Sequence, residues 1–213
     1  MKIKDLYKSF ISYFLLFSMI ALIVCGVMSY VQYNRLSNTY LNLIESYQTI
    51  RAANQTIISL DGAALSVGSF IYKNDATSLT KLPELIIAAE VNFAALKQLV
   101  SDNKTQTDLA NQATPLFDSK IIILTKITKE YKSGQTSQAM LIAEEGSKLH
   151  LTTQINTYIQ AIKQEEVKQL NQHAKNLVKF KTQINSFIPM LGILSALFFI
   201  CFLFLLDKYL KRY

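Results

Sequence analysis

A heptad repeat runs through residues 36–71, which read LSNTYLNLIESYQTIRAANQTIISLDGAALSVGSFI. Its repeated positions, called the seam below, alternate steps of four and three residues: Leu36, Tyr40, Leu43, Tyr47, Ile50, Asn54, Ile57, Asp61, Ala64, Gly68 and Ile71. This spacing is typical of a helix that packs against another helix along its length. The stretch therefore predicts one long helix with the seam on its buried face, ending at KNDAT (73–77).

Three seam positions, Asn54, Asp61 and Gly68, hold residues that a purely apolar interface would not use. One interpretation is structural, because a buried polar residue fixes helix register and small residues let two helices approach closely. The other is that these residues contact a ligand or an ion inside the fold. Both interpretations make them candidate site residues.

Two apolar segments, residues 10–31 and 187–206, contain no charged side chain. Each is long enough to cross a hydrocarbon core of about 30 Å as a helix, the form that satisfies its backbone hydrogen bonds in lipid. The first segment is longer than the apolar region of a signal peptide, and no small-residue cleavage site follows it. The sequence therefore predicts two transmembrane helices.

Basic residues flank the two apolar segments on their outer sides: Lys2, Lys4, Lys8, Lys208, Lys211 and Arg212. The positive-inside rule then places residues 1–9 and 207–213 in the cytoplasm and residues 32–186 outside. We expect a two-pass membrane protein with both termini in the cytoplasm and an external domain. The rest of the net charge of +7 is interspersed with carboxylates, so nucleic acid is not an expected partner.

Three further helices are predicted between the seam helix and the second apolar segment. The second has Pro83 in its first turn, the third spans about 109–131, and the fourth runs from about Gln138 into residues 187–206. Short polar turns at 101–107 and 132–137 connect them. The expected fold is all-α: an up-down-up-down four-helix bundle whose helices one and four continue into the membrane helices.

The fourth helix shows a five-residue step in its apolar pattern, from Ile162 to Val167. Such a phase slip locally changes how a helix packs. Glu165 and Glu166 lie at this slip, so they are candidates for a position where a signalling helix changes its packing.

Sequence motifs for catalysis or metal binding are absent. The chain has no HExxH, EF-hand, phosphate-loop or nucleophile-elbow pattern. Its two histidines, His150 and His173, would lie about 35 Å apart on one helix. We therefore expect no enzyme activity, no metal and no cofactor.

Three stretches carry a family resemblance: DGAALSVGSFIYKND (61–75), SDNKTQTDL (101–109) and KSGQTSQAMLIAEEG (132–146), followed by Glu165. Between two membrane segments, this arrangement resembles the type-3 CHASE domain over residues 32 to about 180. The resemblance implies an extracellular sensory module of bacterial histidine kinases, diguanylate cyclases or chemoreceptors. Many members have an acidic residue near Ala63 and an arginine near Val67. This chain lacks both, so their roles do not transfer.

Only DKYLKRY (207–213) follows the second apolar segment, which leaves no room for a transmitter domain. We therefore expect a sensory input module that relays an external stimulus through paired membrane helices to a separate output, such as the histidine kinase of a two-component system or a cyclase. The alternative is a stand-alone membrane scaffold that modulates such a partner. A homodimer is expected, because the heptad positions of helices one and four exceed what two shorter helices cover.

Overall fold

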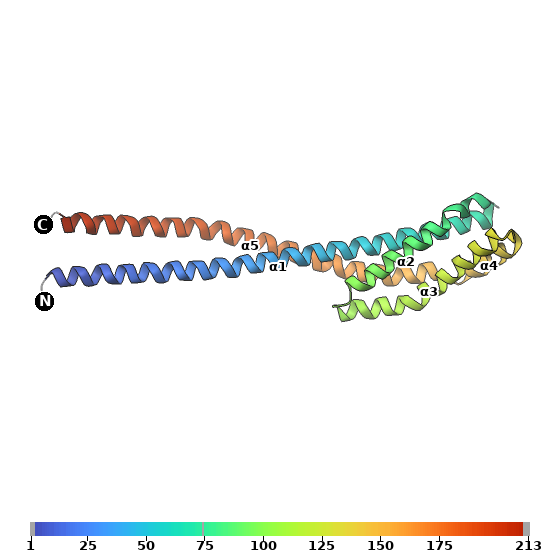
Figure 1. Cartoon of the computed structure of the whole chain (residues 1–213), viewed down its shortest axis with the longest axis horizontal. Helices are drawn as coiled ribbons and strands as arrows, with labels where there is room; N and C mark the ends of the chain where they lie inside the picture. Colours follow the sequence, from blue (N-terminus) through green and yellow to red (C-terminus); the bar gives the residue numbers. More distant parts are fainter. Residues whose placement is uncertain (1–2, 74, 211–213) are drawn as a thin grey trace. The chain divides into compact units, whose positions relative to one another are not determined.

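The computed structural model describes residues 3–73 and 75–210, and all regular structure in these ranges is helical. The elements are α1 (Ile3–Lys73), the 3-10 helix η1 (Ala76–Lys81), α2 (Leu82–Leu99), α3 (Lys104–Lys132), α4 (Thr136–Lys148) and α5 (Leu151–Leu210) (Figure 1). The predicted all-α class is confirmed. The chain divides into two compact units, of which Leu43–Asn171 is called the helical body below.

Helix boundaries in the helical body lie at the predicted polar segments. Helix α1 ends at Lys73, inside KNDAT (73–77). Pro83 lies in the first turn of α2, where its missing N–H leaves no helical hydrogen bond unmade. The Asn103 side chain caps α3 by accepting a hydrogen bond from the backbone N–H of Gln106 at 3.3 Å. These local signals positioned three helix ends correctly.

The core of the helical body consists of two buried clusters. The first joins α1, α2, α3 and α5: Ala52, Ala53, Leu60, Ala89, Phe93, Leu96, Val100, Ala110, Ala113, Phe117, Leu151, Ile155, Ile159 and Ile162. The second joins α1, η1, α2, α3 and α4: Ala63, Val67, Phe70, Leu79, Leu82, Ile86, Leu124, Ile127, Ala139 and Ala143. Phe93 stacks on Phe117 with ring centroids 4.2 Å apart, which ties α2 to α3. Burial of large apolar side chains, worth about 1.5–3 kcal/mol each, thus holds the body together.

The buried face of α1 differs from the predicted seam. Tyr47 is 64% exposed, whereas eight buried residues stand one position before eight successive seam residues: Ser46, Thr49, Ala53, Thr56, Leu60, Ala63, Val67 and Phe70. Ala52 and Ser59 are buried beside them. One residue corresponds to about 100° of helix rotation, so the seam lies at the edge of the buried face. The prediction that the seam itself is the buried stripe is wrong.

The physical reason lies in the hydroxyl residues of the true buried face. Thr49 Oγ1 donates to the carbonyl of Glu45 at 3.0 Å, and Thr56 Oγ1 donates to the carbonyl of Ala52 at 2.9 Å. Because these hydroxyls are satisfied within their own helix, burying them costs little free energy. A pattern that counts only apolar residues misses this face.

The predicted fourth helix is two helices, α4 and α5, separated at Leu149 and His150. His150 has a φ of 51°, a left-handed conformation that costs a non-glycine residue about 1–2 kcal/mol. The break is supported locally, because the His150 N–H donates to the carbonyl of Ser147 at 3.3 Å and Gln154 Nε2 donates to that of Leu149 at 3.0 Å. Neither residue at the break is a glycine or a proline, so the sequence gives no signal that the helix is interrupted there.

The two apolar segments lie outside the helical body. From Ser18 onward, α1 includes a stretch that is long and apolar enough to cross a membrane by length and composition. In the second segment, the apolar stretch found among the described residues is the shorter Ser195–Phe204. None of the described side chains of residues 12–31 is buried.

Candidate functional site

Asp61 links α1 to α5. Its Oδ1 accepts a hydrogen bond from Asn156 Nδ2 at 2.9 Å, across 95 residues of sequence. Asn156 Oδ1 is buried and has no hydrogen-bond partner among the described residues. The contact gives Asp61 a pairing partner on another helix, as the register interpretation requires, while its role stays a prediction.

The two other seam candidates take different positions. Asn54 is half-buried on α1 beside the first core cluster. Gly68 is also half-buried, but a Cβ added there would meet no atom within 4 Å. A close helix approach occurs instead at Gly146 of α4, where an added Cβ would lie 2.7 Å from Ile123 Cγ2 of α3. Gly68 is therefore not a point of close contact between helices.

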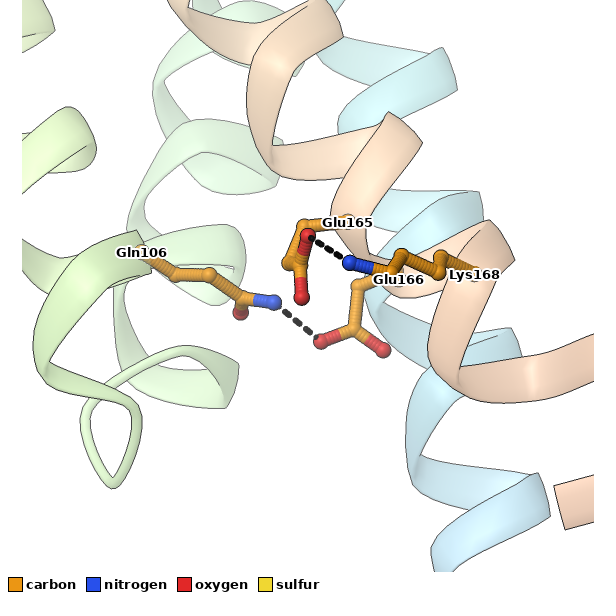
Figure 2. Close-up of polar contacts among 4 residues, drawn as sticks. All are labelled: Gln106, Glu165, Glu166 and Lys168. Carbon is orange, nitrogen blue, oxygen red and sulfur yellow. Dashed lines mark hydrogen bonds and ion pairs between the residues drawn. The ribbon is translucent and has the colours of Figure 1, made fainter. Parts of the chain in front are cut away.

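Glu165 and Glu166 have different environments (Figure 2). Glu165 forms an exposed ion pair with Lys168 at 3.9 Å, a type of contact that contributes about 0–1 kcal/mol. Glu166 is only 7% exposed, and its Oε1 accepts a 2.6 Å hydrogen bond from Nε2 of Gln106 on α3. The candidate pair thus combines a surface residue with a core residue.

Glu166 also explains the five-residue step in the apolar pattern. The buried positions of α5 run Leu151, Ile155, Ile159, Ile162 and Glu166, in steps of four and three residues, and Val167 is 38% exposed. The buried face therefore continues without a slip as far as Glu166, which occupies a core position as a carboxylate. A role of this position in signalling stays a prediction.

Three polar residues of the helical body were not predicted from the sequence: Gln106, Lys120 and Asn156. Gln106 is 1% exposed, although it lies in a polar capping segment. Lys120 is 7% exposed on α3, and no hydrogen bond or ion pair involves it within the described part of the chain. Burial lowers the pKa of Lys120 from its ordinary value of 10.5. In all three cases the type of residue is normally exposed, so composition gives no signal of burial.

No group of three or more His, Cys, Asp or Glu side chains in residues 3–73 and 75–210 could hold a metal ion. The polar contacts of the helical body instead connect helices to each other, with α5 bonded to α1 and to α3.

The family model of the CHASE3 domain matches residues 42–176, a range that contains the whole helical body. The chain belongs to the CHASE3 domain family. CHASE3 is an extracellular sensory domain of signalling proteins, so the resemblance carried by residues 61–75, 101–109 and 132–146 is confirmed. No curated protein and no solved structure matches the chain significantly.

Proposed function

We propose that this CHASE3 protein is a membrane-bound sensory input module. In this proposal the helical body detects a stimulus outside the membrane, and α1 and α5 carry the response through two transmembrane helices. One observation carries the proposal: each of these helices, Ile3–Lys73 and Leu151–Leu210, runs unbroken from the CHASE3 region into an apolar segment. A continuous helix can transmit a shift or rotation along its axis.

Exposed apolar side chains support the membrane part of the proposal. Residues of the first apolar segment, such as Leu16, Met19 and Ile23, are each more than half exposed in the isolated chain. Contiguous exposed apolar surface marks a membrane or protein contact. The flanking lysines and arginines favour cytoplasmic termini in a bacterial inner membrane, with the helical body on the periplasmic side. In this proposal the body is an up-down-up-down four-helix bundle whose fourth helix consists of α4 and α5 together.

Helix α5 is suited to relay a change in packing because it makes side-chain hydrogen bonds to two other helices. Asn156 pairs with α1 and Glu166 pairs with α3, about 15 Å apart along the helix axis. A one-turn shift of α5 would separate both pairs, so the contacts favour discrete arrangements over gradual sliding. The chain would act by transmission to a histidine kinase or cyclase output and not by catalysis.

A homodimer is part of this proposal, through an exposed heptad stripe on α1. The stripe consists of Ile44, Ile58, Leu65 and Tyr72, spaced by multiples of seven residues and exposed by 41–85%, and exposed Arg51 occupies the heptad position between the two isoleucines. Beside it, a shallow surface hollow is lined by α1 residues alone, among them Asp61 and Gly68. The heptad spacing fits a second copy of the same helix, which presents the same stripe in register.

Topology labelling tests the membrane proposal. After Cys25 and Cys201 are replaced by alanine, single cysteines are introduced at exposed Thr125 of α3 and, in a second protein, before residue 10. A membrane-impermeant maleimide added to intact spheroplasts should label position 125 and leave the N-terminal position unlabelled until the membrane is opened. Labelling of both positions, or of neither, in intact spheroplasts would contradict it.

The dimer is tested separately with Leu65→Lys and Ile58→Lys, in detergent, by light scattering. Ile87→Lys on α2 is the matched control, because Ile87 is 61% exposed and lies off the stripe. We expect the α1 variants to be monomeric and the control to keep the dimer mass. Equal masses in all variants would exclude this stripe as the interface.

A further inference from the structure

A cavity of about 230 Å³, partly open to solvent, lies between α1, α3, α4 and the start of α5. Its walls are largely apolar: Val67, Ile71, Ile123, Leu124, Ile127 and Ala143. Its volume is below the roughly 300–1,000 Å³ of sites for drug-sized molecules, so an occupant is small. The cavity is distinct from the Asp61–Asn156 and Gln106–Glu166 contacts, whose four residues do not line it.

Lys120 supplies a buried positive charge to this cavity. It lines the wall from α3 with only 7% of its surface exposed, and no described residue pairs with it. This burial lowers the pKa of Lys120, because it disfavours the charged form. A buried ammonium is stabilised by a nearby negative charge, and no carboxylate is among the lining residues of the cavity.

The first turn of α5 also lines the cavity and supplies hydrogen-bond donors. Leu151, Thr152 and Thr153 line the cavity, and the first backbone N–H of this helix to reach a carbonyl is that of Gln154, bonded to His150 at 3.2 Å. The N–H groups before it have no acceptor within their helix, and the helix dipole makes this end electropositive. Two independent features, a helix N-terminus and a buried lysine, thus favour an anion in one cavity.

We propose that this cavity binds a small carboxylate with a short apolar tail, held by the Lys120 ammonium and the first-turn N–H groups of α5. The apolar walls accommodate the tail, and the charged end excludes neutral molecules of the same shape. The inference deepens the proposed sensory function, on which its biological meaning rests. The proposal also assigns a function to the helix break at His150, because an uninterrupted helix would have no free backbone N–H groups at this point.

The test uses the full chain in lipid nanodiscs, with butyrate as the probe and butyramide as its neutral counterpart of similar shape. We expect butyrate to raise the thermal unfolding temperature and to give a dissociation constant by calorimetry, while butyramide has no effect. Lys120→Met should weaken butyrate binding at least about tenfold, and Lys126→Met, an exposed lysine on the same helix, should bind as the native chain does. Lys120→Gln is the second neutral variant in case the methionine variant does not fold.

Equal binding of butyramide, no response to butyrate, or a butyrate response that survives loss of Lys120 would each overturn the proposal. Binding of inorganic phosphate without butyrate would overturn the assignment to a carboxylate. These outcomes leave the topology labelling unchanged, so failure of the anion site is distinguishable from failure of the sensory proposal.

Discussion

Gln106 of α3 donates a 2.6 Å hydrogen bond to Glu166 of α5, 60 residues away in sequence, and both side chains are nearly withdrawn from solvent. Figure 2 shows the two side chains pointing toward one another from separate helices. A hydrogen bond to a charged group contributes about 1.5–3 kcal/mol, and loss of one partner leaves the other buried and unsatisfied. The contact therefore favours one position of α5 relative to α3.

Removing one member of this pair should destabilise the body more than removing both. We expect Gln106→Leu to lower the free energy of unfolding by about 3 kcal/mol, because it leaves a buried carboxylate without its donor. The double variant Gln106→Leu, Glu166→Leu should recover most of this loss. Thermal unfolding followed by circular dichroism measures the cycle. Additive losses in the double variant would show that the two residues do not interact energetically.

Substitutions of the two partners in the Asp61–Asn156 contact should differ in their effect on stability. Asp61→Asn keeps an oxygen acceptor for Asn156 Nδ2, so the free energy of unfolding should change by less than about 1 kcal/mol. Asn156→Asp places a second carboxylate against Asp61 and should destabilise the protein by about 1–3 kcal/mol. Thermal unfolding of the two variants under identical buffer conditions tests this order. Equal stability would mean that the two side chains do not meet in solution.

Gly146 is predicted to be intolerant of even one methyl group. Alanine normally stabilises a helix by about 1 kcal/mol relative to glycine, but here its Cβ would lie 2.7 Å from Ile123 Cγ2. Gly146→Ala should therefore destabilise the protein by about 1–3 kcal/mol through overpacking. Glu145→Ala, at the exposed neighbouring position of α4, is the control. Combining Gly146→Ala with Ile123→Ala removes the clashing atom, so the methyl group should cost less in that background than in the native one.

Lys120→Met should raise stability in the absence of ligand by about 1–3 kcal/mol at neutral pH, because a poorly solvated charge is removed.

The pH dependence of this difference follows from the lowered pKa of Lys120. Between the folded-state pKa and the ordinary value of 10.5, the unfolded chain binds more protons at this lysine than the folded chain does, so the free energy of unfolding of the native protein rises with pH. The advantage of Lys120→Met should thus shrink as pH approaches 10.5. Tyr72 and His150, which also line the cavity, are present in both proteins and cancel in the comparison. A constant difference from pH 7 to pH 10 would refute a buried charged lysine.

The sequence predicted the helices better than their buried faces. Capping residues and prolines act through local backbone chemistry, so Asn103 and Pro83 marked helix starts reliably. The face of α1 depends on which residues neighbouring helices cover. Thr49 and Thr56 are buried there because each hydroxyl bonds to its own helix, whereas Tyr47 remains exposed in the isolated chain. Apolar counting cannot distinguish these cases.

The candidate site residues were only partly predictable, because the sequence shows a polar residue in an apolar pattern but not its partner on another helix. Asp61 and Glu166 were identified as polar residues in or near an apolar pattern, and both have a partner on another helix. Their partners Asn156 and Gln106 lie 95 and 60 residues away in the sequence, and no local sequence pattern indicates such a pairing. Lys120 was missed because lysine normally marks a solvated face, and only the three-dimensional structure shows that it is buried and lines a cavity together with residues of α1, α4 and α5.

The central claim, that the helical body biases the positions of α1 and α5 near the membrane, is tested most directly by one distance measurement. In the chain with Cys25 and Cys201 replaced by alanine, spin labels are attached at Asn34 and Lys179, both exposed and both outside the helical body. Double electron–electron resonance in nanodiscs then compares the native body with Gln106→Leu, Asn156→Asp and the exposed control Lys126→Met. The account predicts that the two core variants shift the label–label distance distribution by about 1–5 Å and that the control does not. An identical distribution in all four proteins would contradict it.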